Sequence, residues 1–135
     1  MSIKKVKYDA YKLGRREDAF HKGFPAVGDG FIFGNAEAKV YDYEAAEGEK
    51  IIESDKLIPK IGRCVWIEGK GRNDWVRTSV IEDFYIHGDP ENSKDKIVLK
   101  MEHAPVLEGV VFDDGDIFLK TMNSFYILKV NKNKD

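Results

Sequence analysis

The sequence predicts a mainly β protein, a small antiparallel sandwich or partly open barrel of about seven to nine short strands. In several segments apolar and polar residues alternate with a period of two, as in strands that bury one face. Glycines and turn-forming clusters separate these segments at intervals of about ten residues. No amphipathic helical pattern runs for more than about three turns, so we expect at most one short helix.

In the first half of the chain the strand signals are short. Residues 63–68 predict the firmest strand, because they include the apolar run Cys64-Val65-Trp66-Ile67. Residues 14–22 can hold a short helix, since Arg15 to Phe20 contain neither glycine nor proline. The other strands expected in this half are residues 3–13, 31–33 and 39–43, with an edge strand at 50–52.

The second half carries a longer alternating pattern. Residues 75–87 predict one half-buried strand that ends at the turn cluster 88–92. A second antiparallel strand follows, because Ile97, Leu99 and Met101 repeat the period of two. The face of the first strand that we expect to be apolar carries Val76, Thr78, Val80, Phe84 and Ile86.

A tight hairpin is predicted near the end of the chain. The segment Asp113-Asp114-Gly115-Asp116 carries an Asp-Gly turn signal between the apolar runs 109–112 and 117–119. Residues 124–130 are apolar on both faces, which is typical of a central strand or of an interface strand. The tail 131–135 should fray.

Length and composition favour one domain over residues 1–135. A chain of 135 residues with 42% hydrophobic residues can form a single core without metals or disulfides. No apolar run approaches the roughly 20 residues of a membrane helix, and the start of the chain lacks the apolar stretch of a secretory signal. We therefore expect a cytoplasmic protein, in the host cytoplasm if a phage encodes it. Cys64, the one cysteine, is expected to be a buried thiol.

Charge is segregated along the chain although the net charge is only −2. Residues 1–23 and 60–77 are basic, at +4 and +3, whereas residues 37–58 and 102–116 are acidic, at −4 and −5. Such segregation can attract a small anion locally without making the protein a general polyanion binder. We therefore expect no long nucleic acid as a partner.

The sequence contains no recognised catalytic motif. His21, His87 and His103 are scattered, and Cys64 has no second cysteine with which to form a zinc site. The acidic segment 113–116 can be turn chemistry alone or can hold a cation such as calcium. We expect no catalytic residue, no metal and no cofactor.

A glycine-rich basic segment is the first candidate for ligand binding. Gly69 and Gly71 allow backbone amides to converge on one point, and the segment is rich in positive charge. Trp75 offers a face on which a base can stack, and Arg77 and Ser79 share its side of the strand. The alternative is an ordinary hairpin loop with solvated charges. The candidate residues here are Lys70, Arg72, Trp75, Arg77 and Ser79.

A polar group interrupts the last apolar run and is the second candidate. Thr121, Asn123 and Ser124 form either a bend or part of a site, because buried hydroxyl and amide groups need partners. If they meet Arg77, Thr78 and Ser79 across neighbouring strands, the resulting pocket suits a sugar or a nucleobase edge.

Two segments together resemble a family pattern. Trp75-Val76-Arg77-Thr78-Ser79-Val80 and the terminal Thr121-Met122-Asn123-Ser124-Phe125-Tyr126 look like segments of small, mostly uncharacterised β-proteins of phages and mobile elements. The resemblance covers about twenty residues. Small phage proteins of this size include some that sequester the nucleotide second messengers of bacterial immune systems in pockets between protomers. The resemblance implies an anti-defence role of this type.

The sequence therefore favours a non-enzymatic protein, expected to be a homo-oligomer, that captures a nucleotide or cyclic nucleotide signal. Backbone amides and basic side chains would hold the phosphate, Trp75 would stack, and the 121–124 group would orient the ligand. Three alternatives stay open. They are a protein-interaction or structural module such as a phage assembly part or inhibitor, a metal-dependent nucleotide hydrolase that uses the 113–116 carboxylates, and a single-stranded RNA binder.

Overall fold

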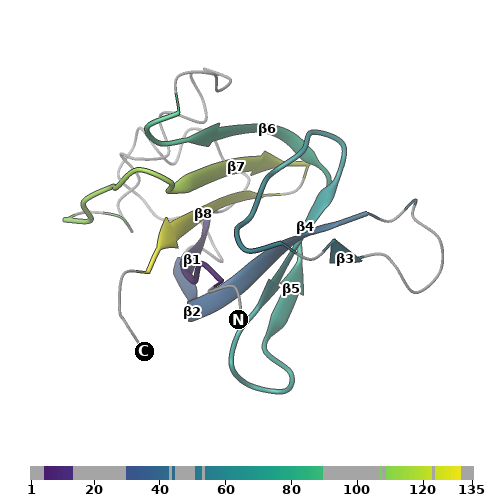
Figure 1. The fold of residues 1–135 in the computed structure, drawn as a ribbon, viewed down its shortest axis with the longest axis horizontal. Coiled ribbons are helices and arrows are strands. Elements are labelled where there is room, and N and C mark those ends of the chain that lie inside the picture. The colour runs from purple at the N-terminus through teal and green to yellow at the C-terminus, as the bar shows by residue number, and fades with distance from the viewer. Residues whose placement is uncertain are drawn as a thin grey trace.

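The computed structural model describes residues 5–13, 30–42, 44, 51–52, 54–89, 107, 109–122 and 124–131 (Figure 1). Eight strands make up one antiparallel sheet in the order β5-β4-β2-β1-β8-β7-β6, and β3 pairs with β2 beside this path. The strands are β1 (Tyr8–Leu13), β2 (Gly30–Tyr41), β3 (Ile51–Ile52), β4 (Cys64–Glu68), β5 (Trp75–Arg77), β6 (Ile81–Ile86), β7 (Ile117–Thr121) and β8 (Phe125–Val130).

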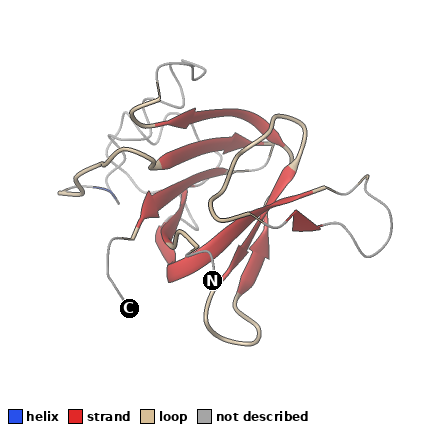
Figure 2. Ribbon diagram, in the orientation of Figure 1, coloured by secondary structure: helices blue, strands red, loops and turns tan. Residues whose placement is uncertain are grey.

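The predicted mainly β class is confirmed. The described residues form strands and loops, apart from a 3₁₀ position at Leu107 (Figure 2), and the sheet is not closed into a barrel. Its two edge strands, β5 and β6, are nevertheless joined by only Thr78, Ser79 and Val80. At this corner the Ile81 amide donates to Arg63 O at 2.8 Å, which ties the start of β6 to the residue before β4. No helix among the described residues is long and apolar enough to cross a bilayer.

The sheet bends at β2. Residues 30–36 of this strand pair with β1, whereas residues 37–41 pair with β4. The sequence predicted two strands here, at 31–33 and 39–43. The structure instead continues the strand through an irregular register, and Asn35 takes the left-handed backbone conformation at φ 52°.

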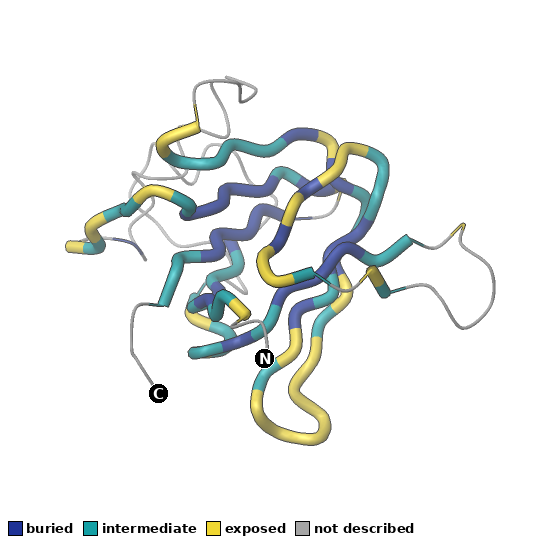
Figure 3. The backbone as a smooth tube through the Cα atoms, viewed as in Figure 1, coloured by how far each residue is buried: buried dark blue, intermediate teal, exposed yellow. Residues whose placement is uncertain are grey.

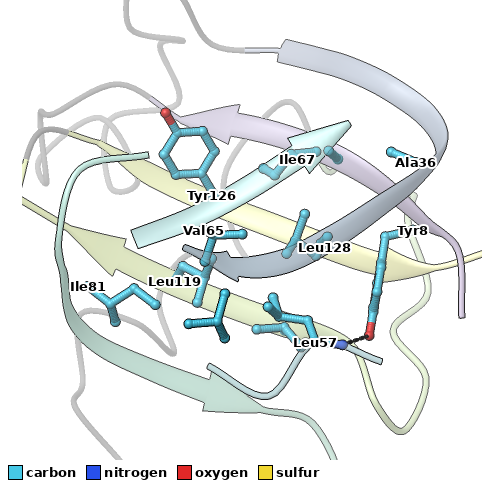
Figure 4. Packing of buried hydrophobic residues seen from close by; sticks show 13 residues of the cluster. Tyr8, Ala36, Leu57, Val65, Ile67, Ile81, Leu119, Tyr126 and Leu128 are labelled. Atoms are coloured by element: carbon cyan, nitrogen blue, oxygen red, sulfur yellow. Dashed lines mark hydrogen bonds between the residues drawn. The ribbon is translucent and has the colours of Figure 1, made fainter. Parts of the chain in front are cut away.

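The main core lies against the concave side of the bent sheet (Figure 4). It joins side chains from six strands and the segment before β4, including Tyr8, Ala36, Leu57, Ile67 and Leu128. A smaller cluster on the other side contains Leu13, Leu107, Phe118, Phe125 and Ile127. Alternate residues of β8 therefore enter opposite clusters, which explains why this segment is apolar on both faces.

Strand β8 is central, as one of the two interpretations of residues 124–130 predicted. It pairs with β1 on one side and β7 on the other. Both its faces and both its edges are covered within one chain, so the interpretation of this strand as an interface between protomers is wrong. Residue 131, expected to fray, is held by hydrogen bonds from Asn131 to Lys7 O and to Asp9 Oδ1, both at 2.8 Å.

The sequence predicted one continuous strand at 75–87, and this prediction is wrong because the structure divides the segment into two strands. Strand β5 pairs with β4, but β6 pairs with β7 at the other edge of the sheet, so the chain must leave one edge and join the other at residues 78–80. Thr78 anchors this crossing, because its amide donates to Val65 O at 2.9 Å and its hydroxyl accepts from the Val65 amide at 3.0 Å.

The predicted hairpin around residues 113–116 is also wrong, although the turn itself is present. The Asp116 amide donates to Asp113 O at 3.1 Å, and Gly115 has φ +96°. Residues 109–113 form no strand, because β7 already pairs with β6 and β8 and has no free edge for them. The helix considered at 14–22 and the strand expected at Ile97 to Met101 lie outside the described residues.

Candidate functional site

Three aromatic rings stack across the outer face of the bent part of the sheet. The antiparallel registers pair Tyr41 with Cys64, Trp66 with Arg77, and Glu68 with Trp75, so these side chains share one face. Their neighbours Val65 and Ile67 point to the core on the other face. We call Tyr41, Trp66 and Trp75 the aromatic ladder.

The aromatic ladder is closely stacked. The ring centroids of Trp66 and Trp75 are 4.6 Å apart with planes 8° apart, and those of Tyr41 and Trp66 are 6.1 Å apart with planes at 19°. Trp75 lies at the outer end and is 50% exposed. A flat, exposed indole on a rigid strand is a platform on which a planar ring or a sugar can stack.

Arg77 lies at the other end of the aromatic ladder. Its guanidinium carbon is 5.1 Å from the centroid of the Tyr41 ring, and its Nη1 donates to Tyr41 Oη at 3.4 Å. No carboxylate pairs with Arg77 among the described residues. The cation–π contact orients the guanidinium while leaving most of its five donors unused.

The predicted phosphate-binding cations lack acidic partners, as do some but not all of the other described basic side chains. Among the described residues, Lys70, Arg72 and Arg77 form no ion pair. In contrast, several basic side chains elsewhere in the structure lie within 4.0 Å of a carboxylate. These are Lys5 and Lys7 with Glu37, Arg63 with Asp42 and Glu44, and Lys129 with Asp113 and Asp116.

An open hollow of about 620 Å³ adjoins the Arg77 end of the aromatic ladder. It brings Arg77 and Ser79 together with Met122, whereas Thr121 and Ser124, which the sequence analysis considered as partners of residues 77–79, do not line it. The Met122 amide donates to Val80 O at 2.9 Å, which fixes this contact. The hollow is lined by Tyr41, Cys64, Arg77, Thr78, Ser79, Val80 and Met122.

Trp75, Lys70 and Arg72 do not line this hollow. Trp66 separates Trp75 from Tyr41, and the two basic residues lie on the exposed loop between β4 and β5 (Figure 3). The predicted site residues therefore form two groups, one at each end of the aromatic ladder. A ligand that reaches both groups must lie along the ladder.

The backbone amides of the glycine-rich loop are already satisfied. The Gly71 amide donates to the Asp74 carboxylate at 3.0 Å, and the Gly69 amide donates to Asp74 O at 2.6 Å. The loop therefore folds around Asp74, and the side chains of Lys70 and Arg72, rather than these amides, are the groups open to an anion.

The group at 121–124 forms a hydrogen-bonded bend, one of the two alternatives considered for it. Thr121 Oγ1 donates to Ser124 O at 2.6 Å, and the Ser124 amide donates to Thr121 Oγ1 at 3.1 Å. Both residues are buried. Met122 is the described residue of the bend that lines the hollow, and Asn123 lies outside the described residues.

Cys64 is a buried thiol, as expected, although it lies at the floor of the hollow. Burial raises its pKa, and the nearby positive charge of Arg77 offsets this only in part. A raised pKa leaves little thiolate at neutral pH, so the site lacks an activated cysteine nucleophile.

Lys129 offsets part of the negative charge of the acidic turn. Lys129 Nζ lies 2.9 Å from Asp113 Oδ2 and 3.4 Å from Asp116 Oδ2. Burial lowers the pKa of Lys129, but its hydrogen bond to Asp113 and the two carboxylate charges outweigh that effect and raise it. No cluster of metal-binding side chains occurs among the described residues. The catalytic pairing considered for these carboxylates involves His87, which contacts Asp114, and His103, which lies outside the described residues.

Sequence reasoning missed Tyr41 and Trp66 as site residues. Trp66 had a usable signal, because the six-residue loop 69–74 closes a hairpin that places Trp66 near Trp75. Tyr41 had none, since its register with Cys64 depends on a pairing across more than twenty residues. Among the tyrosines of the described residues, Tyr8 is buried, and Tyr11, Tyr41 and Tyr85 are partly buried.

No family model, curated protein or solved structure matches the chain. The candidate site consequently stands on its own geometry: a stacked aromatic ladder, an arginine without an acidic partner among the described residues, and an adjoining hollow.

Proposed function

We propose that the protein is a non-enzymatic binding module that captures a small anionic ligand, a nucleotide or a cyclic nucleotide signal. The observation that carries the proposal is Arg77, which Tyr41 orients at the edge of the 620 Å³ hollow and which no described carboxylate neutralises. Guanidinium groups bind phosphates through paired hydrogen bonds, and a partly enclosed hollow strengthens such contacts.

In this proposal the phosphate binds to Arg77 beside Ser79, and the rest of the ligand extends along the aromatic ladder. A base stacked on Trp75 would gain roughly 1–3 kcal/mol, and Lys70 and Arg72 lie on the loop next to that end. A ligand with two rings or two phosphates contacts both groups of residues, which favours dinucleotides, including cyclic ones, over mononucleotides.

The hollow is open on one side, so a second protomer packed there would enclose the ligand. We therefore include homo-oligomerisation and an anti-defence role of the sequestering type in the proposal. Light scattering with and without ligand measures the first of these directly. A monomer in both conditions would limit the site to one chain.

A thermal-shift screen against mono-, di- and cyclic nucleotides tests the proposal, with divalent-metal and nucleotide-free controls. Ligand at about 100 times its Kd stabilises the native state by roughly 2.7 kcal/mol, or about 10 °C for a domain of this size. The proposal predicts a shift with the ligand recovered intact. No shift across the panel favours the protein-interaction alternative, and recovery of a cleaved product identifies an enzyme.

Substitutions of Trp75 test the stacking step. Trp75→Phe keeps an aromatic platform, whereas Trp75→Ala removes it, and neither change touches the main core because the side chain is half exposed. We expect Trp75→Ala to weaken binding by about tenfold and Trp75→Phe by much less, as measured by calorimetric titration. Equal affinity of the two variants and the parent would contradict stacking on Trp75.

A further inference from the structure

A second cavity lies apart from the hollow and shares no lining residue with it. Its volume is about 570 Å³, within the range of sites that bind small molecules. It lies where the start of β1, residues 56–58, the end of β6 and the turn before β7 meet. Its apolar walls come from Val6, Leu57, Ile58, Ile86, Ile117 and Val130.

A buried hydroxyl with a free proton opens onto this cavity. Tyr8 is 2% exposed, and its oxygen accepts a hydrogen bond from the Leu57 amide at 3.1 Å (Figure 4). The described residues provide no acceptor for its own hydroxyl hydrogen. Buried donors are normally paired, so this proton favours a ligand oxygen within the cavity.

Asp114 supplies a carboxylate acceptor at the mouth of the same cavity, beside His87. His87 Nδ1 is buried and makes no hydrogen bond among the described residues, although Asp114 Oδ1 is 3.5 Å away. The side chain of Asp114 is 89% exposed. Two carboxylates, Asp89 and Asp114, against the single cation Lys56 leave the charged groups of the lining with a net negative charge.

We propose that this cavity binds a small organic amine with an apolar ring or chain and an oxygen at the end remote from the amine. The apolar body packs against the walls, the oxygen accepts from Tyr8, and the ammonium donates to Asp114 at the mouth. The net charge disfavours anions, so this ligand class differs from the nucleotide proposed for the hollow.

Three probes separate the contribution of the ligand oxygen from that of the amine in a two-dimensional amide NMR titration of the full chain. They are tyramine, 2-phenylethylamine and 4-hydroxyphenylacetate. Tyramine carries both groups, the second probe lacks the oxygen, and the third replaces the amine with a carboxylate. We expect tyramine to shift the amides of Ile58, Ile86 and Gly115, 2-phenylethylamine to bind more weakly, and the acid not to bind. No shift at these amides with millimolar tyramine, or equal binding of the acid, overturns the proposal.

Two variant pairs locate the binding. Ile58→Lys places a repelling charge in the cavity, whereas Ile61→Lys changes an equally exposed isoleucine outside it, at 57% against 60% exposure. Asp114→Asn removes the carboxylate at the mouth, with Glu82→Gln as its exposed control. We expect Ile58→Lys to abolish tyramine binding and Asp114→Asn to weaken it about fivefold. Unchanged affinity in both, or equal losses in the controls, overturns the assignment.

Discussion

At the residue scale, Asp116 shows how a buried charge is stabilised by several partners at once. Its side chain is fully buried and accepts hydrogen bonds from the Val130 amide and the Asp113 amide, both at 2.8 Å. Lys129 supplies the compensating charge at 3.4 Å. These contacts hold the turn before β7 against the end of β8, beside the second cavity.

Substitution of Asp116 tests this network, and substitution of its neighbour Asp114 in the same turn is the control. Asp116→Ala leaves the Val130 and Asp113 amides without their acceptor and removes one of the two carboxylates that Lys129 contacts. We expect it to lower the free energy of unfolding by about 2–4 kcal/mol. Asp114→Ala is the control, because its side chain is exposed, and it should leave stability almost unchanged. Urea unfolding monitored by circular dichroism measures both, and equal midpoints would contradict the network.

Part of the candidate site follows from single residues in the sequence. Arg77 and Ser79 line the hollow, and the sequence indicated both because they lie two and four residues after Trp75. Lys70 and Arg72 were identified by charge, but the role expected for the neighbouring glycine amides was wrong, because Asp74 satisfies them. That contact could not be inferred, since it depends on how the loop closes.

At the element scale, β2 determines where the site forms. The bend lets residues 37–41 pair with β4, and that pairing places Tyr41 beside Trp66. The irregular backbone lies just before this segment, at Asn35, whose amide donates to Asp9 Oδ1 at 3.0 Å.

Substitutions at Asn35 test whether the left-handed backbone is required. Asn35→Gly accepts φ 52° without strain, so we expect little change in stability. Asn35→Val places a β-branched side chain in this conformation and should cost about 1–2 kcal/mol. Thermal unfolding compares the two variants. A valine variant as stable as the glycine variant would show that the backbone relaxes at low cost.

Elements with one clear periodicity and a local partner were predictable from the sequence. Residues 64–68 and 125–130 form strands close to their expected bounds, because apolar residues mark both segments. The errors came from non-local pairing. The hairpin at 113–116 failed since β7 already has two neighbours, and the strand at 75–87 is split because its halves pair at opposite edges of the sheet.

At the scale of the whole molecule, several titrating groups favour the protonated state in the folded protein. Burial raises the pKa values of Tyr8, Tyr11 and Tyr126 above the ordinary 10.0. The pKa of Lys129 is raised above 10.5 by Asp113 and Asp116, despite the opposing effect of burial.

These shifts predict alkaline unfolding. A group whose pKa is higher in the folded state contributes stability that is complete below its unfolded pKa and is lost as the pH rises through its folded pKa. We expect the contribution of these four groups to be constant from pH 7 to 9 and to fall above about pH 10. Urea unfolding across this range measures the loss, and Tyr126→Phe should reduce it. A free energy of unfolding that stays constant to pH 11 would contradict the shifts.

The proposed capture of an anionic ligand depends on cations at both ends of the aromatic ladder that no described carboxylate neutralises. The variant that removes Arg72 and Arg77 together, each replaced by alanine, tests this most directly. Calorimetric titration with the nucleotide that gives the largest thermal shift should show no binding to this variant. Its melting temperature should be almost unchanged, because both side chains are exposed. Lys60→Ala, an exposed cation away from the site, should bind like the parent. Retained affinity in the double variant would contradict the proposed capture.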